Sequence, residues 1–134
     1  MRKGKKYSHL PTEEMVRSYK YLSPALSSLY SEIKDLSKKK PDGIVSAYKI
    51  RLANKTLADV KQLLPTDPAL SHLDVFSEDE LPQYSDLILV LGQFQAALVR
   101  FQKKFNRYDS DRAATRWITQ EDPSDEDADP EEDD

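Results

Sequence analysis

Apolar residues recur at helical spacing over residues 12–39, and this stripe predicts the first element of the chain. Successive apolar positions are separated by alternating steps of four and three, as on one face of an α-helix. Pro24 lies inside the stripe, where a proline removes one backbone hydrogen bond. Because the stripe keeps its phase across the proline, we expect a helix that is kinked, or split into two abutting helices, at Pro24. The stripe consists of Met15, Tyr19, Leu22, Leu26, Leu29, Ile33 and Leu36.

Two further helices are predicted by the same kind of pattern. Asp42 is a suitable N-cap for a second amphipathic helix over residues 43–64. Ser77 and Glu80 have the spacing of a capping box, which marks the start of a helix. The strongest apolar stripe follows it, over residues 84–105. The sequence therefore predicts an all-α fold, an antiparallel bundle of three main helices.

The helical pattern is absent from both ends of the chain. Residues 1–11 are basic and lack periodicity, so we expect a flexible arm before a bundle that spans residues 12–106. Residues 107–120 read as a linker or a short helix that contains Trp117, the only tryptophan. Ten of the residues in 121–134 are acidic and none is large and apolar, which predicts a disordered acidic tail.

The net charge of −4 conceals a division between body and tail. All 20 Lys and Arg precede residue 121, together with 14 of the 24 acidic residues, so the body carries +6 and the tail −10. The chain has no cysteine, which excludes disulfides and thiolate metal sites and favours a reducing compartment. No apolar stretch has the length of a membrane span. We therefore expect a cytoplasmic protein, or a nuclear one in a eukaryote.

The inventory of reactive side chains does not indicate an enzyme. The two histidines, His9 and His72, have no histidine, cysteine or acid at a metal-binding helical spacing. No serine or threonine lies near a credible general base. The acidic run over residues 78–80 is interpreted as a complement to the positive N-terminus of the third helix. We expect no catalytic site, no metal and no cofactor.

Basic residues are concentrated near two predicted helix ends. The short link after the first helix makes the first two helices antiparallel. If the third helix runs alongside the first in the same direction, their C-terminal ends share one pole. That basic pole consists of Lys38, Lys39, Lys40, Arg100, Lys103, Lys104 and Arg107. Two interpretations stay open, a binding patch and a set of cations that complement helix C-termini.

Three roles are compatible with the acidic tail. It can compete with phosphates for the basic pole as an electrostatic brake, act as a nucleic-acid mimic for a basic partner, or increase solubility. Ser124 precedes three acidic residues and resembles an acid-directed phosphorylation site. Trp117 either packs on the bundle or serves as an anchor for a partner protein.

These features lead to one functional hypothesis and one alternative. The first is a non-enzymatic helical interaction protein, an accessory or regulatory subunit that binds another protein and carries the acidic tail as brake or mimic. The alternative is a nucleic-acid-binding protein that uses the basic pole and the N-terminal arm. No membrane partner is expected, and the oligomeric state is left open. Salt dependence separates the two hypotheses, because binding to phosphates weakens steeply with salt.

Overall fold

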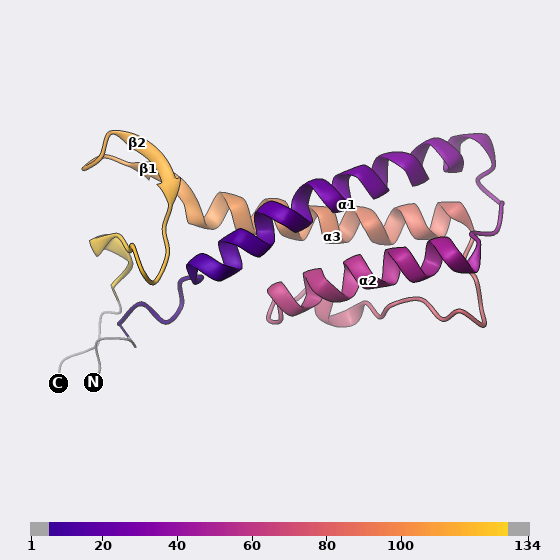
Figure 1. The fold of residues 1–134 in the computed structure, drawn as a ribbon, viewed down its shortest axis with the longest axis horizontal. Helices are drawn as coiled ribbons and strands as arrows, with labels where there is room; N and C mark the ends of the chain where they lie inside the picture. The colour runs from indigo at the N-terminus through magenta and orange to yellow at the C-terminus, as the bar shows by residue number, and fades with distance from the viewer. Residues whose placement is uncertain (1–5, 129–134) are drawn as a thin grey trace. The chain divides into compact units, whose positions relative to one another are not determined.

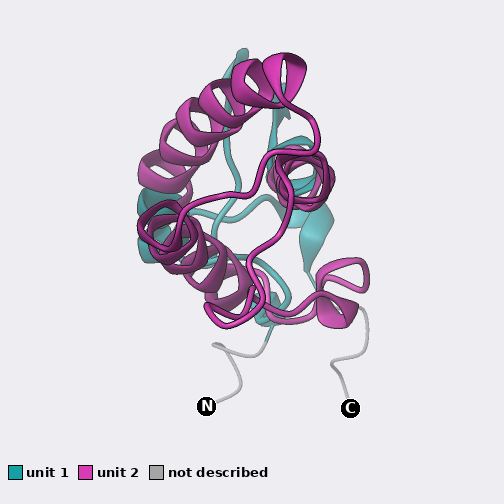
Figure 2. Cartoon of the chain, turned by 90° about the vertical axis from the view of Figure 1, so that its right-hand side faces the viewer, with its two compact units in different colours: residues 1–18, 100–134 teal, residues 19–99 magenta. Residues whose placement is uncertain are grey.

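The computed structural model describes residues 6–128, and most of them are helical (Figure 1). Its three α-helices confirm the predicted helical class, and a two-stranded sheet adds to it. The chain divides into two compact units, residues 19–99 (unit 2) and residues 1–18 with 100–134 (unit 1), coloured separately in Figure 2. The elements are α1 (Glu13–Lys39), α2 (Ala47–Leu63), η2 (Leu70–His72), α3 (Tyr84–Phe105), β1 (Asn106–Asp109), β2 (Ala114–Trp117) and η3 (Asp125–Asp127).

Helix α1 is continuous from Glu13 to Lys39, so the predicted split at Pro24 is wrong. Its start agrees with the sequence, because the Thr12 hydroxyl accepts a hydrogen bond from the Met15 amide at 3.1 Å. Pro24 has no amide hydrogen, so the carbonyl of Lys20 lacks its helical hydrogen-bond partner. Both residues are exposed. Solvent on this side replaces the missing hydrogen bond and lets the helix continue.

Helix α2 begins later than predicted, at Ala47, and its N-cap is Ser46 instead of Asp42. The Ser46 hydroxyl accepts a hydrogen bond from the amide of Lys49 at 3.2 Å. The preceding residues cannot be helical because their backbone is paired with the segment before α3. Ile44 forms an isolated antiparallel bridge with Gln83.

This backbone pairing determines the direction of α3 within unit 2. Three hydrogen bonds join the segment after α1 to the start of α3, from Val45 N to Pro82 O (2.9 Å), Tyr84 N to Gly43 O (2.9 Å) and Ser85 N to Pro41 O (3.2 Å). Helices α2 and α3 therefore begin at the same end, the end where α1 finishes (Figure 1). The prediction that the first and third helices run in the same direction is wrong. The connection of 20 residues between α2 and α3 is long enough to return along α2, which spans about 26 Å.

Gly43 lies where the two segments approach most closely. A Cβ atom at this position would be 3.1 Å from the Lys40 carbonyl oxygen and 3.1 Å from the Tyr84 ring. Either neighbour would have to move to admit a side chain. The glycine therefore serves the close approach of two backbones.

The connection between α2 and α3 is attached to α2 by side chains. The side-chain amide of Asn54 forms two hydrogen bonds with one residue of the connection. It donates to Phe76 O at 2.7 Å and accepts from Phe76 N at 2.9 Å. The Lys61 ammonium donates to the Leu73 carbonyl. These contacts satisfy backbone groups that no helix or sheet pairs.

The expected capping box before α3 does not start a helix. The Ser77 hydroxyl accepts from the amide of Asp79, two residues on, at 3.0 Å, which forms a local turn. The helix begins only at Tyr84. The helix starts later than predicted because the Pro82 carbonyl accepts a hydrogen bond from the Val45 amide.

Residues 106–117 form a β-hairpin, so the predicted short helix around Trp117 is wrong. Strands β1 and β2 pair in antiparallel register, from Asn106 opposite Trp117 to Asp109 opposite Ala114. In the connecting loop, the Asp109 carboxylate accepts from the Asp111 amide at 3.0 Å, and Ala113 adopts a left-handed φ of 52°. A side chain that forms a hydrogen bond with the backbone of its own turn stabilises the chain reversal and competes with helix formation.

The core of unit 2 is formed by the apolar stripes of its three helices. Leu26, Ile33, Leu57, Leu91 and Phe94 are all fully buried. These residues belong to the stripes that the sequence predicts. The helix faces that pack together are thus confirmed, although the direction of α3 is not.

Replacing Leu91 or Leu98 by alanine should lower the free energy of unfolding by about 2–5 kcal/mol, because each leaves a cavity in a packed core. Urea denaturation followed by circular dichroism measures this change. Leu89→Ala is the matched control, since Leu89 is on the same helix and is 67% exposed. A loss below about 0.5 kcal/mol for both core variants would show that the buried face is misassigned.

Candidate interaction surfaces

Three large apolar residues at the start of α2 and just before it are exposed, and we call them the apolar ridge: Ile44 in the extended segment before the helix, and Tyr48 and Leu52 on the helix. Their exposed fractions are 57%, 64% and 50%. At about 100° per residue, Tyr48 and Leu52 lie about 180° and 140° around the helix from the buried Leu57. These residues therefore point away from the core instead of extending it.

The backbone under the apolar ridge is held in place. Val45 is fully buried and alternates with Ile44, as expected for extended backbone, so anchoring one orients the other outward. The Ser46 cap and the hydrogen bond from Val45 to Pro82 hold the start of α2. A ridge on a fixed backbone loses little conformational entropy when it binds.

Charged residues are close to the apolar ridge in the sequence. Lys38, Lys39 and Lys40 are exposed and precede Ile44 by only a few residues. Arg51 and Lys55 of α2 form exposed ion pairs, with Glu78 at 3.0 Å and Asp59 at 3.3 Å. The charged residues between 38 and 59, together with Glu78, are Lys38, Lys39, Lys40, Lys49, Arg51 and Lys55 with Asp42, Asp59 and Glu78.

The cations of the predicted basic pole are divided between the two units. Lys38, Lys39 and Lys40 belong to unit 2, whereas Arg100, Lys103, Lys104 and Arg107 belong to unit 1. The basic pole, and the brake that would act on it, therefore stay predictions.

Arg107, the last of the predicted cations, is engaged with the acidic segment. Its Nη2 donates to the Asp127 carboxylate at 2.8 Å, and Nε is buried without a hydrogen-bond partner within residues 6–128. The tail predicted to be disordered is in defined positions over residues 121–128, where it binds the hairpin. Residues 129–134 lie outside the described residues.

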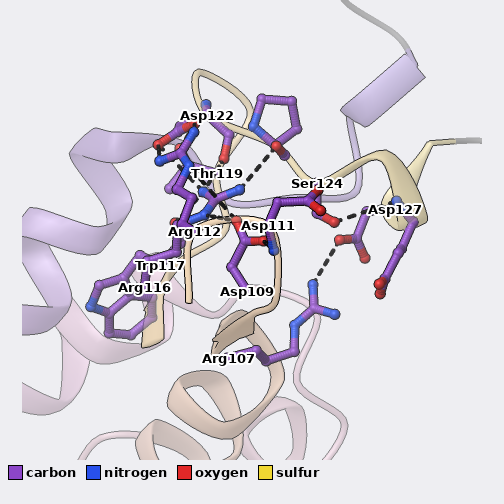
Figure 3. A network of polar contacts seen from close by, with 12 residues as sticks. Arg107, Asp109, Asp111, Arg112, Arg116, Trp117, Thr119, Asp122, Ser124 and Asp127 are labelled. Carbon is purple, nitrogen blue, oxygen red and sulfur yellow. Dashed lines mark hydrogen bonds and ion pairs between the residues drawn. The ribbon is translucent and has the colours of Figure 1, made fainter. Parts of the chain in front are cut away.

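Arg116 is the centre of a polar cluster that ties the acidic segment to the hairpin (Figure 3). Its side chain is only 13% exposed. Nε donates to the Asp109 carboxylate at 2.6 Å, Nη1 donates to the Asp122 carbonyl at 2.6 Å, and Nη2 donates to the Pro123 carbonyl at 3.1 Å. One planar guanidinium thus joins both strands to the chain that follows them.

Arg112 completes the cluster from the hairpin loop. It binds Asp122 through two parallel hydrogen bonds, Nη1 to Oδ2 at 2.9 Å and Nη2 to Oδ1 at 2.6 Å. The hydrogen bond from Arg116 lowers the pKa of Asp109 below its usual 3.8. The hydrogen bonds from Arg112 likewise lower the pKa of Asp122.

The N-terminal segment is also packed in unit 1, unlike the flexible arm expected from the sequence. Leu10 is buried, and its carbonyl accepts from the Gln120 side chain at 2.7 Å. The Glu121 carboxylate accepts from the amide of Glu13 at 2.9 Å, where it complements the start of α1. Residues 1–5 lie outside the described residues.

Trp117, the predicted partner anchor, contacts the protein itself. It is half-buried, and its ring centroid lies 5.7 Å from that of Phe101. The neighbouring Ile118 is buried and donates its amide to the Phe105 carbonyl at 2.7 Å. Of the two roles inferred for Trp117 from the sequence, packing against the protein is the one observed. Its role as an anchor for a partner protein stays a prediction.

The apolar ridge was missed in the sequence because Tyr48 and Leu52 adjoin the apolar stripe of the second helix. Tyr48 and Leu52 widen the apolar stripe of this helix, so periodicity alone placed them with the core. The only available signal was the width of that stripe, which exceeds what one buried face needs.

No family model, curated protein or solved structure matches this chain. No helix within the described residues is long and apolar enough to cross a membrane. The function must therefore be inferred from the surfaces of the molecule.

Arg116→Lys should destabilise unit 1 more than Arg112→Lys. A lysine cannot reproduce the fork that reaches three acceptors, and lost hydrogen bonds to charged groups cost about 1.5–3 kcal/mol. The same change at the more exposed Arg112 should cost less than the change at Arg116, because solvent screens its ion pair with Asp122. Trp117, as the only tryptophan, makes fluorescence during urea unfolding a direct measure of unit 1. Equal losses in the two variants would contradict the central role of Arg116.

Unit 1 should lose stability as the pH falls below about 4. The pKa values of Asp109 and Asp122 are lower in the folded protein than the usual 3.8, so their stabilisation is present above that pH. It disappears as the pH falls through the folded pKa values. Thermal melts between pH 5 and 2.5, followed by Trp117 fluorescence, should show a weaker pH dependence in Asp109→Asn and Asp122→Asn than in the wild type. An unchanged dependence in both variants would oppose this account.

Proposed function

We propose that the chain is a non-enzymatic accessory subunit that binds another protein through the apolar ridge. The observation that carries this proposal is the exposure of Tyr48 and Leu52 on the side of α2 opposite its core face, together with that of Ile44 just before the helix. Contiguous exposed apolar side chains are costly in water and mark interaction sites. Tyrosine is also among the residues that dominate interface energies.

The surroundings of the apolar ridge indicate the chemistry of its partner. The stretch 38–59 with Glu78 holds six cations and three acids, so a partner surface with apolar anchors and an acidic rim is complementary. An amphipathic helix is the expected form of this surface, because Tyr48 and Leu52 are anchors one turn apart on α2. The exposed lysines before Ile44 would mainly accelerate association.

The nucleic-acid alternative receives less support from the same surfaces. It depends on seven cations, of which three belong to unit 2 and four to unit 1. Arg107 is already paired with Asp127. We therefore propose a protein partner as the primary ligand.

Leu52→Glu and Tyr48→Glu should abolish recovery of the partner without unfolding the protein. Tagged wild-type and variant chains are expressed in the native cell, and proteins recovered in near-stoichiometric amounts are quantified. Loss of an interface anchor costs about 2 kcal/mol or more, so recovery should fall roughly 30-fold. Circular dichroism should be unchanged because both positions are exposed.

Leu89→Glu provides the matched control, since Leu89 is as exposed as the ridge but lies on α3. Its recovery of the partner should equal that of the wild type. If the ridge variants retain the same partners as this control, the apolar ridge is not the binding surface.

A further inference from the structure

Ser124 lies at the start of the last described turn of unit 1 and is held by local contacts. Its hydroxyl accepts from the amide of Glu126 at 3.4 Å, and its carbonyl accepts from the amide of Asp127 at 2.9 Å. Before this turn, Arg112 and Arg116 bind Asp122 and Pro123, and at its end Asp127 is paired with Arg107 (Figure 3). Local opening of the turn breaks that one ion pair and leaves the contacts of Asp122 and Pro123 in place.

Ser124 and Arg107 line the same cleft, which has a volume of about 310 Å³. Arg107 uses Nη2 to bind Asp127, but its buried Nε has no acceptor within the described part of the chain. A guanidinium presents several donors in a fixed plane and binds phosphate through two of them at once. A phosphate on Ser124 would therefore share this cleft with a guanidinium that has an unsatisfied donor.

The sequence after Ser124 has the chemistry that one class of kinase selects. Asp125 and Glu126 are exposed, and Asp127 follows them. We propose that Ser124 is phosphorylated by an acid-directed serine kinase, and that the phosphate then binds Arg107 in place of Asp127. This inference is independent of the apolar ridge, which lies in unit 2.

The modification is an ordinary phosphoryl transfer from a nucleoside triphosphate. The Ser124 oxygen attacks the γ-phosphorus and forms a new O–P bond. The bond from that phosphorus to the β–γ bridging oxygen breaks, and the nucleoside diphosphate leaves. The hydroxyl proton passes to the base of the kinase.

Charge decides the competition for Arg107. A phosphoserine carries about −1.5 to −2 charges and three acceptor oxygens, against the single charge of Asp127. The carboxylates of Asp109 and Asp111 line the same cleft and oppose the added charge. Asp109 is itself paired with Arg116 at 2.6 Å, which reduces this repulsion.

The first experiment tests whether the site is modified. The full-length protein is incubated with a purified acid-directed serine kinase and ATP, and the modified residue is located by mass spectrometry. Incorporation at Ser124 should reach one phosphate per chain and be lost in Ser124→Ala. Ser77, which also precedes three acidic residues, is quantified separately in the same spectra. Ser110 lines the same cleft but precedes Asp111-Arg112, so it should stay unmodified. Absence of phosphate from Ser124 would overturn the proposal.

The second experiment tests whether the phosphate binds Arg107. The midpoint of the ³¹P NMR titration is compared between phosphorylated wild type and phosphorylated Arg107→Gln. Arg107 should hold the wild-type midpoint lower by about 0.5 pH unit or more, roughly threefold in the protonation equilibrium. Arg112→Gln, which removes a cation from Asp122 instead, should leave the midpoint unchanged. Equal midpoints in wild type and Arg107→Gln would overturn the assignment.

A third variant keeps the test valid if Arg107→Gln weakens the fold. Asp127→Asn removes the competing carboxylate and leaves the arginine in place. In the phosphorylated protein this change should lower the ³¹P midpoint further. A midpoint equal to that of the wild type would show that phosphate and Asp127 do not share Arg107.

Discussion

The backbone pairing between the segment after α1 and the segment before α3 is the constraint on which unit 2 depends. The amides of Val45, Tyr84 and Ser85 each donate across this crossing. Because the crossing places the starts of α2 and α3 together, the connection between them must return along α2. The same crossing fixes the start of α2 and with it the orientation of the apolar ridge. Core packing, helix direction and the candidate binding surface therefore share one cause.

Unit 1 depends on a different kind of interaction, the solvation of buried arginine by acidic residues and carbonyls. Arg116 is nearly buried, so its charge requires acceptors at short distance. Asp109 supplies a carboxylate from within the hairpin, and the acidic segment supplies the carbonyls of Asp122 and Pro123. Much of the acidity in residues 121–128 thus has a structural partner. This arrangement explains how a segment without large apolar residues holds a defined position.

The two proposed functions use these two constraints separately. The apolar ridge is a rigid, exposed surface in unit 2, which suits constitutive binding to a partner protein. Ser124 belongs to a turn of unit 1 that follows the Arg116 cluster and is held by local hydrogen bonds and the Asp127–Arg107 ion pair, which suits a reversible modification. Phosphorylation would change which acid occupies Arg107 without any requirement for a change in the ridge.

The sequence by itself determined the helical class, the buried stripes and the Thr12 cap, because periodicity and capping are local properties. It did not determine the direction of α3, since backbone hydrogen bonds between distant segments leave no side-chain pattern. It did not distinguish Tyr48 and Leu52 from the buried residues of α2. Sequence periodicity cannot tell an exposed apolar residue next to a buried stripe from a member of that stripe. Only the tertiary structure paired Asp127 with Arg107 and Arg116 with the carbonyls of the acidic segment. An ion pair requires acid and base to be brought within reach, and that depends on the fold of the intervening chain.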